Sequence, residues 1–269
     1  MAEPTERYTH GHHESVLRSH SWRTVENSAA YLAPYLVPGA TILDVGCGPG
    51  TITIDFAARV APAHVIGMDA SAEIIEKATE LAAERDVSNV EFVVGNAHEL
   101  PYDDGTFDIV HAHQVLQHVS NPVALLRELR RVRRPDGVVA ARDVDFGACF
   151  WYPDSEGLSN WLALVRAAQS GNEGEPDAGR RLKAWATDAG FADVVSTASV
   201  WAFNSEADRE WWGSLWETRM LQSALAVDAI DTGLATQDEL IDISMAWREW
   251  ANNPQGWFAM PHGEVLCLG

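Results

Sequence analysis

The chain has 269 residues, 46% of them hydrophobic, which is enough to bury the core of one sizeable domain. Its 39 acidic residues outnumber 19 basic ones, and the formal net charge of −20 argues against a nucleic-acid partner, because phosphate backbones need a basic face. Three scattered cysteines and the lack of a long apolar run argue against a disulfide framework and a membrane span. We therefore expect a reduced, cytoplasmic protein with no membrane partner.

Residues 1–38 are predicted to form an arm and a helix that reach the core at Pro38. The arm, Tyr8 to Thr24, reads YTHGHHESVLRSHSWRT and holds four of the ten histidines. Three interpretations stay open: a metal site, a lid that flexes at a glycine and closes over the ligands, and an ordinary solvated helix start. Neither a cysteine nor a carboxylate recurs at a matching interval, so we predict no metal. The histidines are His10, His12, His13 and His20, and the favoured lid residues are Tyr8, His13 and His20.

The segment from Ile42 to Thr51 reads ILDVGCGPGT, in which an apolar strand runs into a glycine-rich turn. The strand has no polar face, so it is predicted to be buried on both sides, and the following TITIDFAARV is predicted as a helix. The three glycines let the backbone turn tightly and approach a ligand, and the first amides of the helix point to the same place. The turn therefore predicts a site for a small polar cofactor.

The spacing of the glycines separates two kinds of cofactor. The turn reads G-x-G-x-G, whereas a dinucleotide fingerprint reads G-x-G-x-x-G and would have its third glycine at Thr51. Asp44 stands at the lip of the turn, where its charge would repel a pyrophosphate and attract the ammonium group of an amino-acid moiety. An NAD(P)-dependent oxidoreductase is therefore the less favoured alternative.

Two further strands extend the pattern. VIGMDAS, Val65 to Ser71, ends a buried strand with Asp69, nineteen residues after Gly50, where a carboxylate can accept both hydroxyls of a ribose. Nicotinamide enzymes place an acid in the same way, so Asp69 alone does not decide the cofactor. The stretch from Val90 to Val119 then adds a strand, the run LPYDDGTFDIV and the ending LQHV.

From about residue 38 to residue 145 the chain resembles the class I S-adenosylmethionine-dependent methyltransferases, and within them the ubiquinone/menaquinone C-methyltransferase-like group. The resemblance implies an α/β fold: a Rossmann-like sheet of seven mostly parallel strands with helices on both faces, and S-adenosylmethionine as cofactor. It also implies that Asn96, in place of the common aspartate, and Ala97 flank the adenine, and that Gln114 lies near the methionine part. An asparagine carbonyl can still accept from the adenine amino group. The residues expected to bind the cofactor are Tyr8, Asp44, Gly46, Cys47, Gly48, Gly50, Thr51, Asp69, Ala70, Asn96, Ala97 and Gln114.

The cofactor-binding core is predicted to span residues 39–146, and the character of the chain changes beyond it. Residues 147–269 hold ten of the eleven tryptophans, while the core holds none. Helices predicted near 158–168, 208–226 and 237–250 interrupt the final strands and would form a cap over the carboxyl ends of the sheet, where ligands bind. The tryptophans are interpreted either as the wall of an acceptor pocket or as the filling of the cap's own core or a subunit interface. We expect one domain overall, and a homodimer stays open beside a monomer.

The chemistry that the resemblance implies is in-line displacement at a sulfonium methyl carbon, with orientation and electrostatic preorganisation supplying most of the catalysis. The expected acceptor is a small, aromatic or apolar molecule. Carbon, oxygen and nitrogen all stay open as the methylated atom, and the quinone-like resemblance favours carbon. A partner subunit that binds the cofactor without turnover is a further alternative. The candidate general bases are His13, His20, His118 at the start of a helix after the fourth strand, and Asp145 just past the fifth strand.

Overall fold

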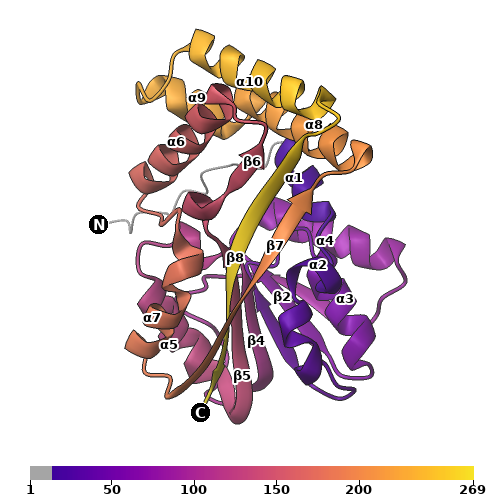
Figure 1. Cartoon of the computed structure of the whole chain (residues 1–269). Helices are drawn as coiled ribbons and strands as arrows, with labels where there is room; N and C mark the ends of the chain where they lie inside the picture. The colour runs from indigo at the N-terminus through magenta and orange to yellow at the C-terminus, as the bar shows by residue number, and fades with distance from the viewer. Residues whose placement is uncertain (1–13) are drawn as a thin grey trace.

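The computed structural model describes residues 14–269, so the predicted site residues Tyr8 and His13 lie outside the described residues. Five neighbouring strands of its central sheet are parallel. They are β1 (Ile42–Val45), β2 (Val65–Asp69), β3 (Val90–Val94), β4 (Phe107–His113) and β5 (Arg133–Val144). Their spatial order is β3-β2-β1-β4-β5, which brings the carboxyl ends of all five to the same edge of the sheet (Figure 1).

The other side of the sheet is antiparallel. β8 (Trp257–Leu268) lies beside β5, and β7 (Asp193–Phe203) pairs with β8 along nearly its whole length. A short strand, β6 (Phe150–Tyr152), pairs with the first residues of β8 and makes eight strands, one more than the seven expected. β6 forms because β8 is 12 residues long and extends beyond the end of β5. A three-residue strand is too short to show a hydrophobic period in the sequence.

Helices cover both faces of the parallel strands (Figure 1). One face carries α2 (Val25–Ser28), η1 (Ala30–Tyr35), α3 (Thr51–Val60) and α4 (Ala72–Glu84). The opposite face carries α5 (Pro122–Val132) and α7 (Leu182–Asp188). All four residues of β1 are buried, with Ile42 packed in the cluster of α3 and Leu43 in the cluster of α5. Burial on both faces is what a strand without a polar face predicts.

Four helices form a cap at the edge where the parallel strands end. α6 (Glu156–Gly171) precedes β7, and α8 (Glu206–Gln222), α9 (Ala224–Asp231) and α10 (Gln237–Asn252) lie between β7 and β8, as the sequence predicts. Figure 1 shows them together beyond the start of β8, which runs antiparallel to β5. No helix within residues 14–269 combines the length and the apolar composition that a bilayer crossing needs.

Most tryptophans of the cap pack against one another. The ring centroid of Trp161 lies 4.8 Å from that of Trp216 and 5.0 Å from that of Trp247, and all three side chains are fully buried. Phe258 of β8 joins the same cluster. These residues therefore fill the cap's own core, which is one of the interpretations that the sequence allows.

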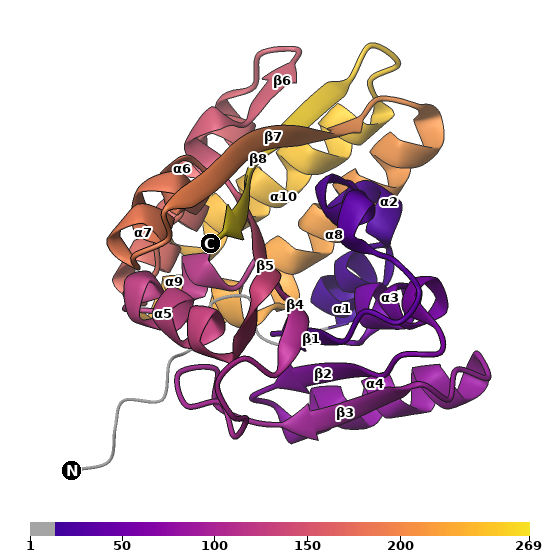
Figure 2. The same cartoon turned by 90° about the horizontal axis from the view of Figure 1, so that it is seen from below.

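The helix α1 (Glu14–Ser21) lies between α8 of the cap and α3 of the core (Figure 2). Thr51 Oγ1 at the start of α3 donates a hydrogen bond of 3.2 Å to the His20 carbonyl, and Arg219 Nη2 of α8 donates one of 3.1 Å to Ser19 Oγ. Just after α1, the ring of Trp22 packs 5.2 Å from that of Trp201. The N-terminal helix is thereby bonded to both the core and the cap.

Candidate active site

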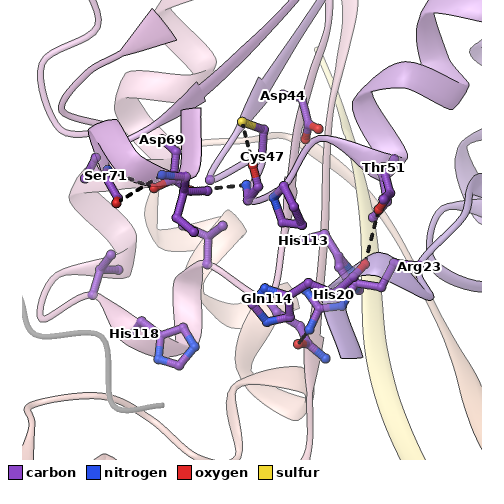
Figure 3. A pocket seen from close by; sticks show the side chains of 18 residues that line it. His20, Arg23, Asp44, Cys47, Thr51, Asp69, Ser71, His113, Gln114 and His118 are labelled. Carbon is purple, nitrogen blue, oxygen red and sulfur yellow. Dashed lines mark hydrogen bonds between the residues drawn. The ribbon is translucent and has the colours of Figure 1, made fainter. Parts of the chain in front are cut away.

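A cavity of about 620 Å³ opens where β1, β2 and β4 end, and α1 forms part of its wall (Figure 3). Its position is the one that ligands take in open α/β sheets, beyond the carboxyl ends of the strands. The lining residues are His20, Arg23, Asp44, Gly46, Cys47, Gly48, Pro49, Thr51, Ile52, Asp69, Ala70, Ser71, Ile74, His113, Gln114, Val115, His118 and Val119.

The glycine turn after β1 forms one wall of the cavity. Gly46 has a φ of 67°, and a Cβ atom there would come within 2.4 Å of Val115 Cγ2, so only glycine fits. Gly50 is not among the lining residues of the cavity. It caps the start of α3, and a Cβ atom on it would meet the ring of Phe92 at 2.6 Å. Gly50 therefore allows close packing at the start of α3, and its predicted contact with the cofactor stays a prediction.

Asp44 lies beside the glycine turn, and two side chains bond to its carboxylate. His111 Nδ1 lies 2.7 Å from Asp44 Oδ1, and Thr53 Oγ1 donates to Asp44 Oδ2 at 2.6 Å. An ionised carboxylate only accepts, so the imidazole proton sits on Nδ1. These two bonds fix a buried negative charge beside the glycine turn, where it suits a ligand ammonium group.

Asp69 ends β2 on the opposite side of the turn. Its Oδ2 accepts from the Gly48 amide at 3.1 Å, and its Oδ1 accepts from the Ser71 amide at 3.0 Å. Each carboxylate oxygen has a further lone pair, so both stay able to accept from ribose hydroxyls. Ala70 also lines the cavity, as predicted, whereas Ser71 is a lining residue that the sequence analysis missed.

The far end of the cavity is built around Gln114, which directly follows β4. Its φ of 55° lies in the left-handed region that few non-glycine residues adopt and that clusters at functional sites. The Gln114 amide nitrogen lies 2.9 Å from His262 Nε2, and His262 Nδ1 lies 3.0 Å from the Met260 carbonyl. A carbonyl only accepts, so the proton of His262 is on Nδ1 and its Nε2 accepts from Gln114.

This directional chain turns the Gln114 carbonyl oxygen toward the guanidinium of Arg23, which donates to it (Figure 3). Burial and the charge of Arg142 lower the pKa of His262 well below its ordinary value, so the imidazole stays neutral. Arg23 and His262 lie 91 and 148 residues from Gln114 along the chain. The sequence analysis gave neither of them a role.

The predicted general bases are distributed differently from expectation. His20 and His118 line the cavity, but His118 closes the short turn η2 (Leu116–His118) instead of opening a helix. Burial, followed by the nearby charge of Arg23, lowers the pKa of His118 to about 3, which makes it a weak proton acceptor. His13 lies outside the described residues.

Asp145 is not at the mouth of the cavity. Its two carboxylate oxygens both accept from Arg180, each at 2.6 Å, and it is buried next to the cap. The sequence could not show this partner, which lies 35 residues further along the chain. Asp145 is therefore paired with Arg180 and is not among the residues that line the cavity, and its role as a base stays a prediction.

Asn96 and Ala97 are not among the residues that line the cavity. Asn96 is exposed, and its Oδ1 accepts from the His98 amide at 3.0 Å. Their predicted contact with adenine thus stays a prediction. Within residues 14–269 no three His, Cys, Asp or Glu side chains are grouped for a metal ion, while three histidines of the arm lie outside this range.

Comparison with known proteins identifies the family. Residues 36–190 match the family described as a methyltransferase domain. An uncharacterized methyltransferase of Schizosaccharomyces pombe is 36% identical over 99% of this chain and 98% of that protein. A demethylmenaquinone methyltransferase of Listeria monocytogenes is 39% identical over 39% of this chain and 45% of that protein. The structure of a Haemonchus contortus phosphoethanolamine N-methyltransferase in complex with S-adenosylhomocysteine has a similar fold, with a TM-score of 0.55 at 17% identity over 90% of this chain and 52% of that one.

The chain therefore belongs to the methyltransferase-domain family and is a class I S-adenosylmethionine-dependent methyltransferase. The predicted family, fold class and cofactor are confirmed. The residues of the cavity also fit this cofactor. The buried carboxylate of Asp44, the tight glycine turn and the carboxylate of Asp69 at the end of β2 surround one space.

Proposed function

We propose that this enzyme transfers the methyl group of S-adenosylmethionine to a small, aromatic or apolar molecule. The observation that carries the proposal is the polarity of one cavity, with Asp44 and Asp69 at one end and His20, Arg23 and Gln114 at the other. A volume of about 620 Å³ falls within the usual range of about 300–1,000 Å³ for small-molecule sites.

Some residues of the cavity would bind the cofactor, and others would position the reacting groups. The cofactor, when bound, supplies an electrophilic methyl group on a sulfonium. Asp44 would hold its ammonium group, Asp69 its ribose hydroxyls, and Gln114 would face its methionine part. The helix α1 closes the wall beside Thr51 and keeps water from the reacting atoms, so that orientation and exclusion of solvent supply most of the rate.

Where the acceptor must lose a proton, His20 is the residue to receive it. His20 lines the cavity, whereas the low pKa of His118 and the ion pair of Asp145 leave those two unsuited to the task. The methylated atom is carbon, oxygen or nitrogen. The similarity to a protein named demethylmenaquinone methyltransferase favours carbon within this proposal.

The test is isothermal calorimetry of the protein with S-adenosylhomocysteine, beside NADH under the same conditions. Micromolar binding of the first and none of the second is expected, because Asp44 repels a pyrophosphate. Incubation with S-adenosylmethionine and a panel of phenols, quinones and aromatic amines should then yield products heavier by one methyl group. Binding of NADH alone would contradict the proposal. Cofactor binding without product from any acceptor would instead favour a subunit without turnover.

A further inference from the structure

One buried imidazole in the cavity wall makes no hydrogen bond within residues 14–269. It belongs to His113, the last residue of β4, which lines the cavity beside Gln114 and is 5% exposed (Figure 3). Its Nδ1 and Nε2 atoms are both buried, and neither has a partner in this part of the chain. Buried polar atoms are normally bonded, so a ligand that fills the cavity and displaces its water should supply a partner for this ring.

The neighbouring histidines are bonded to the protein. The rings of His111 and His262 lie nearly parallel to that of His113, with centroids 6.5 and 6.3 Å away from it. His111 bonds to Asp44, and His262 bonds to Gln114. Neither His111 nor His262 is among the lining residues. Of the three rings in this row, His113 is therefore the one that a ligand in the cavity can reach.

The imidazole of His113 is neutral. Burial, followed by the charges of Arg23 and Arg142, lowers the pKa of His113 well below its ordinary value. A neutral imidazole has one N–H donor and one nitrogen that accepts, and an un-ionised hydroxyl group can bond to either of them. A protonated imidazole would instead donate from both nitrogens and suit an anion. His113 therefore matches a neutral hydroxyl group better than a carboxylate or a phosphate.

Aromatic rings and uncharged polar atoms lie close to His113. A smaller cavity of about 40 Å³ adjoins the larger one, since Gln114 lines both. The ring of Trp201 on its wall lies 5.9 Å from that of His113. Gln117 Oε1 and Trp212 Nε1 on the same wall are buried, and they have no hydrogen-bond partner in the described part of the chain. This side of the site thus suits an aromatic molecule whose polar groups are uncharged.

We propose that His113 determines which acceptors bind, by forming a hydrogen bond with an un-ionised hydroxyl group on the ring of the acceptor. The inference rests on the proposed function and deepens it by naming the substrate class, a neutral hydroxylated aromatic molecule. His113 binds the hydroxyl group and does not take its proton, because its pKa is low. A ring without the hydroxyl group would leave the buried imidazole unbonded, and this cost is the source of the discrimination.

The test uses the full-length protein saturated with S-adenosylhomocysteine and two matched pairs of probes, phenol with toluene and 2-naphthol with 2-methylnaphthalene. The members of each pair have nearly the same shape, and only one of them carries a hydroxyl group. Calorimetry gives the ratio of the two affinities in each pair. This ratio should favour the hydroxyl group about ten- to a hundredfold more in the wild-type protein than in His113→Phe, in which the comparison of ratios cancels the different hydrophobicity of the probes.

The matched control is His64→Phe, the same substitution at an exposed residue that is not among the lining residues. It should keep the wild-type ratio. His113→Phe should keep the wild-type affinity for S-adenosylhomocysteine, which also shows that the variant is folded. A second readout does not depend on the variant. In spectra of the wild-type protein with ¹⁵N-labelled histidine, 2-naphthol should shift a ring-nitrogen resonance of His113, and 2-methylnaphthalene should shift it much less.

Four results would overturn the proposal. They are failure of the wild-type protein to bind either hydroxylated probe, an unchanged ratio in His113→Phe, a His113 resonance that responds equally to both members of a pair, and a loss of S-adenosylhomocysteine affinity in folded His113→Phe as large as the loss for phenol. The last result would make His113 a cofactor residue. Absence of S-adenosylhomocysteine binding by the wild-type protein would instead contradict the proposed function, so the two failures are distinguishable.

Discussion

Asp69 bonds to the protein with both oxygens of the carboxylate that is assigned to the ribose. Asp69→Ala is expected to weaken the binding of S-adenosylhomocysteine by about 1–3 kcal/mol, since charged hydrogen bonds to the ligand and to the Gly48 amide are lost together. Calorimetry measures the change. Asp104→Ala, which removes an exposed carboxylate paired with Arg131, is the control and should bind as the wild-type protein does. An unchanged affinity of Asp69→Ala would overturn the ribose assignment.

Asp143 links stability to pH. Burial raises its pKa from an ordinary 3.8 to about 8, although its Oδ1 accepts from the Gln117 amide at 3.1 Å. Between these two values the folded protein holds a proton that the unfolded chain releases, so raising the pH favours unfolding. The contribution of Asp143 to the free energy of unfolding is fully present below the pKa of the unfolded chain, and it is lost as the pH rises through about 8.

Asp143→Asn should therefore change the pH dependence of the free energy of unfolding. The amide oxygen can still accept from Gln117, but the side chain no longer titrates. Relative to the wild-type protein, the variant should gain stability with a slope of up to about 1.4 kcal/mol per pH unit as the pH rises from acid to neutral. Urea unfolding at several pH values measures this. His113 and His262 are present in both proteins, so their opposite contributions cancel in the difference, and parallel curves would refute the assignment.

At the scale of residues, the sequence predicted those parts of the site that lie within a short stretch of chain. Asp44, the glycines and Asp69 follow directly from strand ends, and the structure places all but Gly50 around the cavity. The far end of the cavity and the contact between α1 and the cap join segments that are far apart, since Gln114 meets His262 148 residues away and Ser19 meets Arg219 200 residues away. One sequence carries no record of such contacts, because they arise only when the sheet and the cap have assembled.

Among the elements, α1 contributes His20 to the wall of the cavity and is the predicted lid. Removing residues 1–20 deletes Ser19 and His20, and with them the bonds to Arg219 and Thr51. Turnover should then fall more than the affinity for S-adenosylhomocysteine, because the acceptor loses its wall while the glycine turn stays intact. The thiol of Cys47 reports the opening directly, as it lines the cavity while Cys149 and Cys267 are buried.

Alkylation with iodoacetamide, followed by mass spectrometry, should modify Cys47 about tenfold faster in the truncated protein. Burial, with the charges of Asp44 and Asp69, raises the pKa of this thiol, so the reaction should accelerate with pH in both proteins. S-adenosylhomocysteine should protect Cys47 in each of them. Equal alkylation rates without ligand would show that α1 is no lid.

The elements were predictable to different degrees for physical reasons. Helices of the core carry caps and periodic apolar faces, as Ser71 and Asn121 do at the starts of α4 and α5. β8 begins at Trp257, but Pro261 and Gly263 interrupt its pattern, so only the part from Glu264 onward is recognisable as a strand in the sequence. β7 shows the reverse case, because most of its residues are exposed, yet its valines and threonine are typical of a strand.

The whole molecule is joined by β8. Residues 262–267 of β8 lie against β5 of the core, its first residues lie against β6, and β7 follows it along nearly its whole length before leading into the cap. The cap tryptophans pack onto Phe258 of the same strand. We propose that residues 1–38, 39–146 and 147–269 are therefore parts of one folding unit and not separate domains.

This unity predicts that a ligand of the core stabilises the cap. S-adenosylhomocysteine is expected to bind in the cavity of the core, whereas ten of the eleven tryptophans lie in residues 147–269. At about 100 times its dissociation constant the ligand should add about 2.7 kcal/mol to the free energy of unfolding. The midpoint of urea unfolding followed by tryptophan fluorescence should then rise together with the midpoint followed by circular dichroism, because one cooperative unit has one transition. If the ligand left the fluorescence midpoint unchanged while the unfolding curve from circular dichroism showed two steps, the cap would unfold independently of the core.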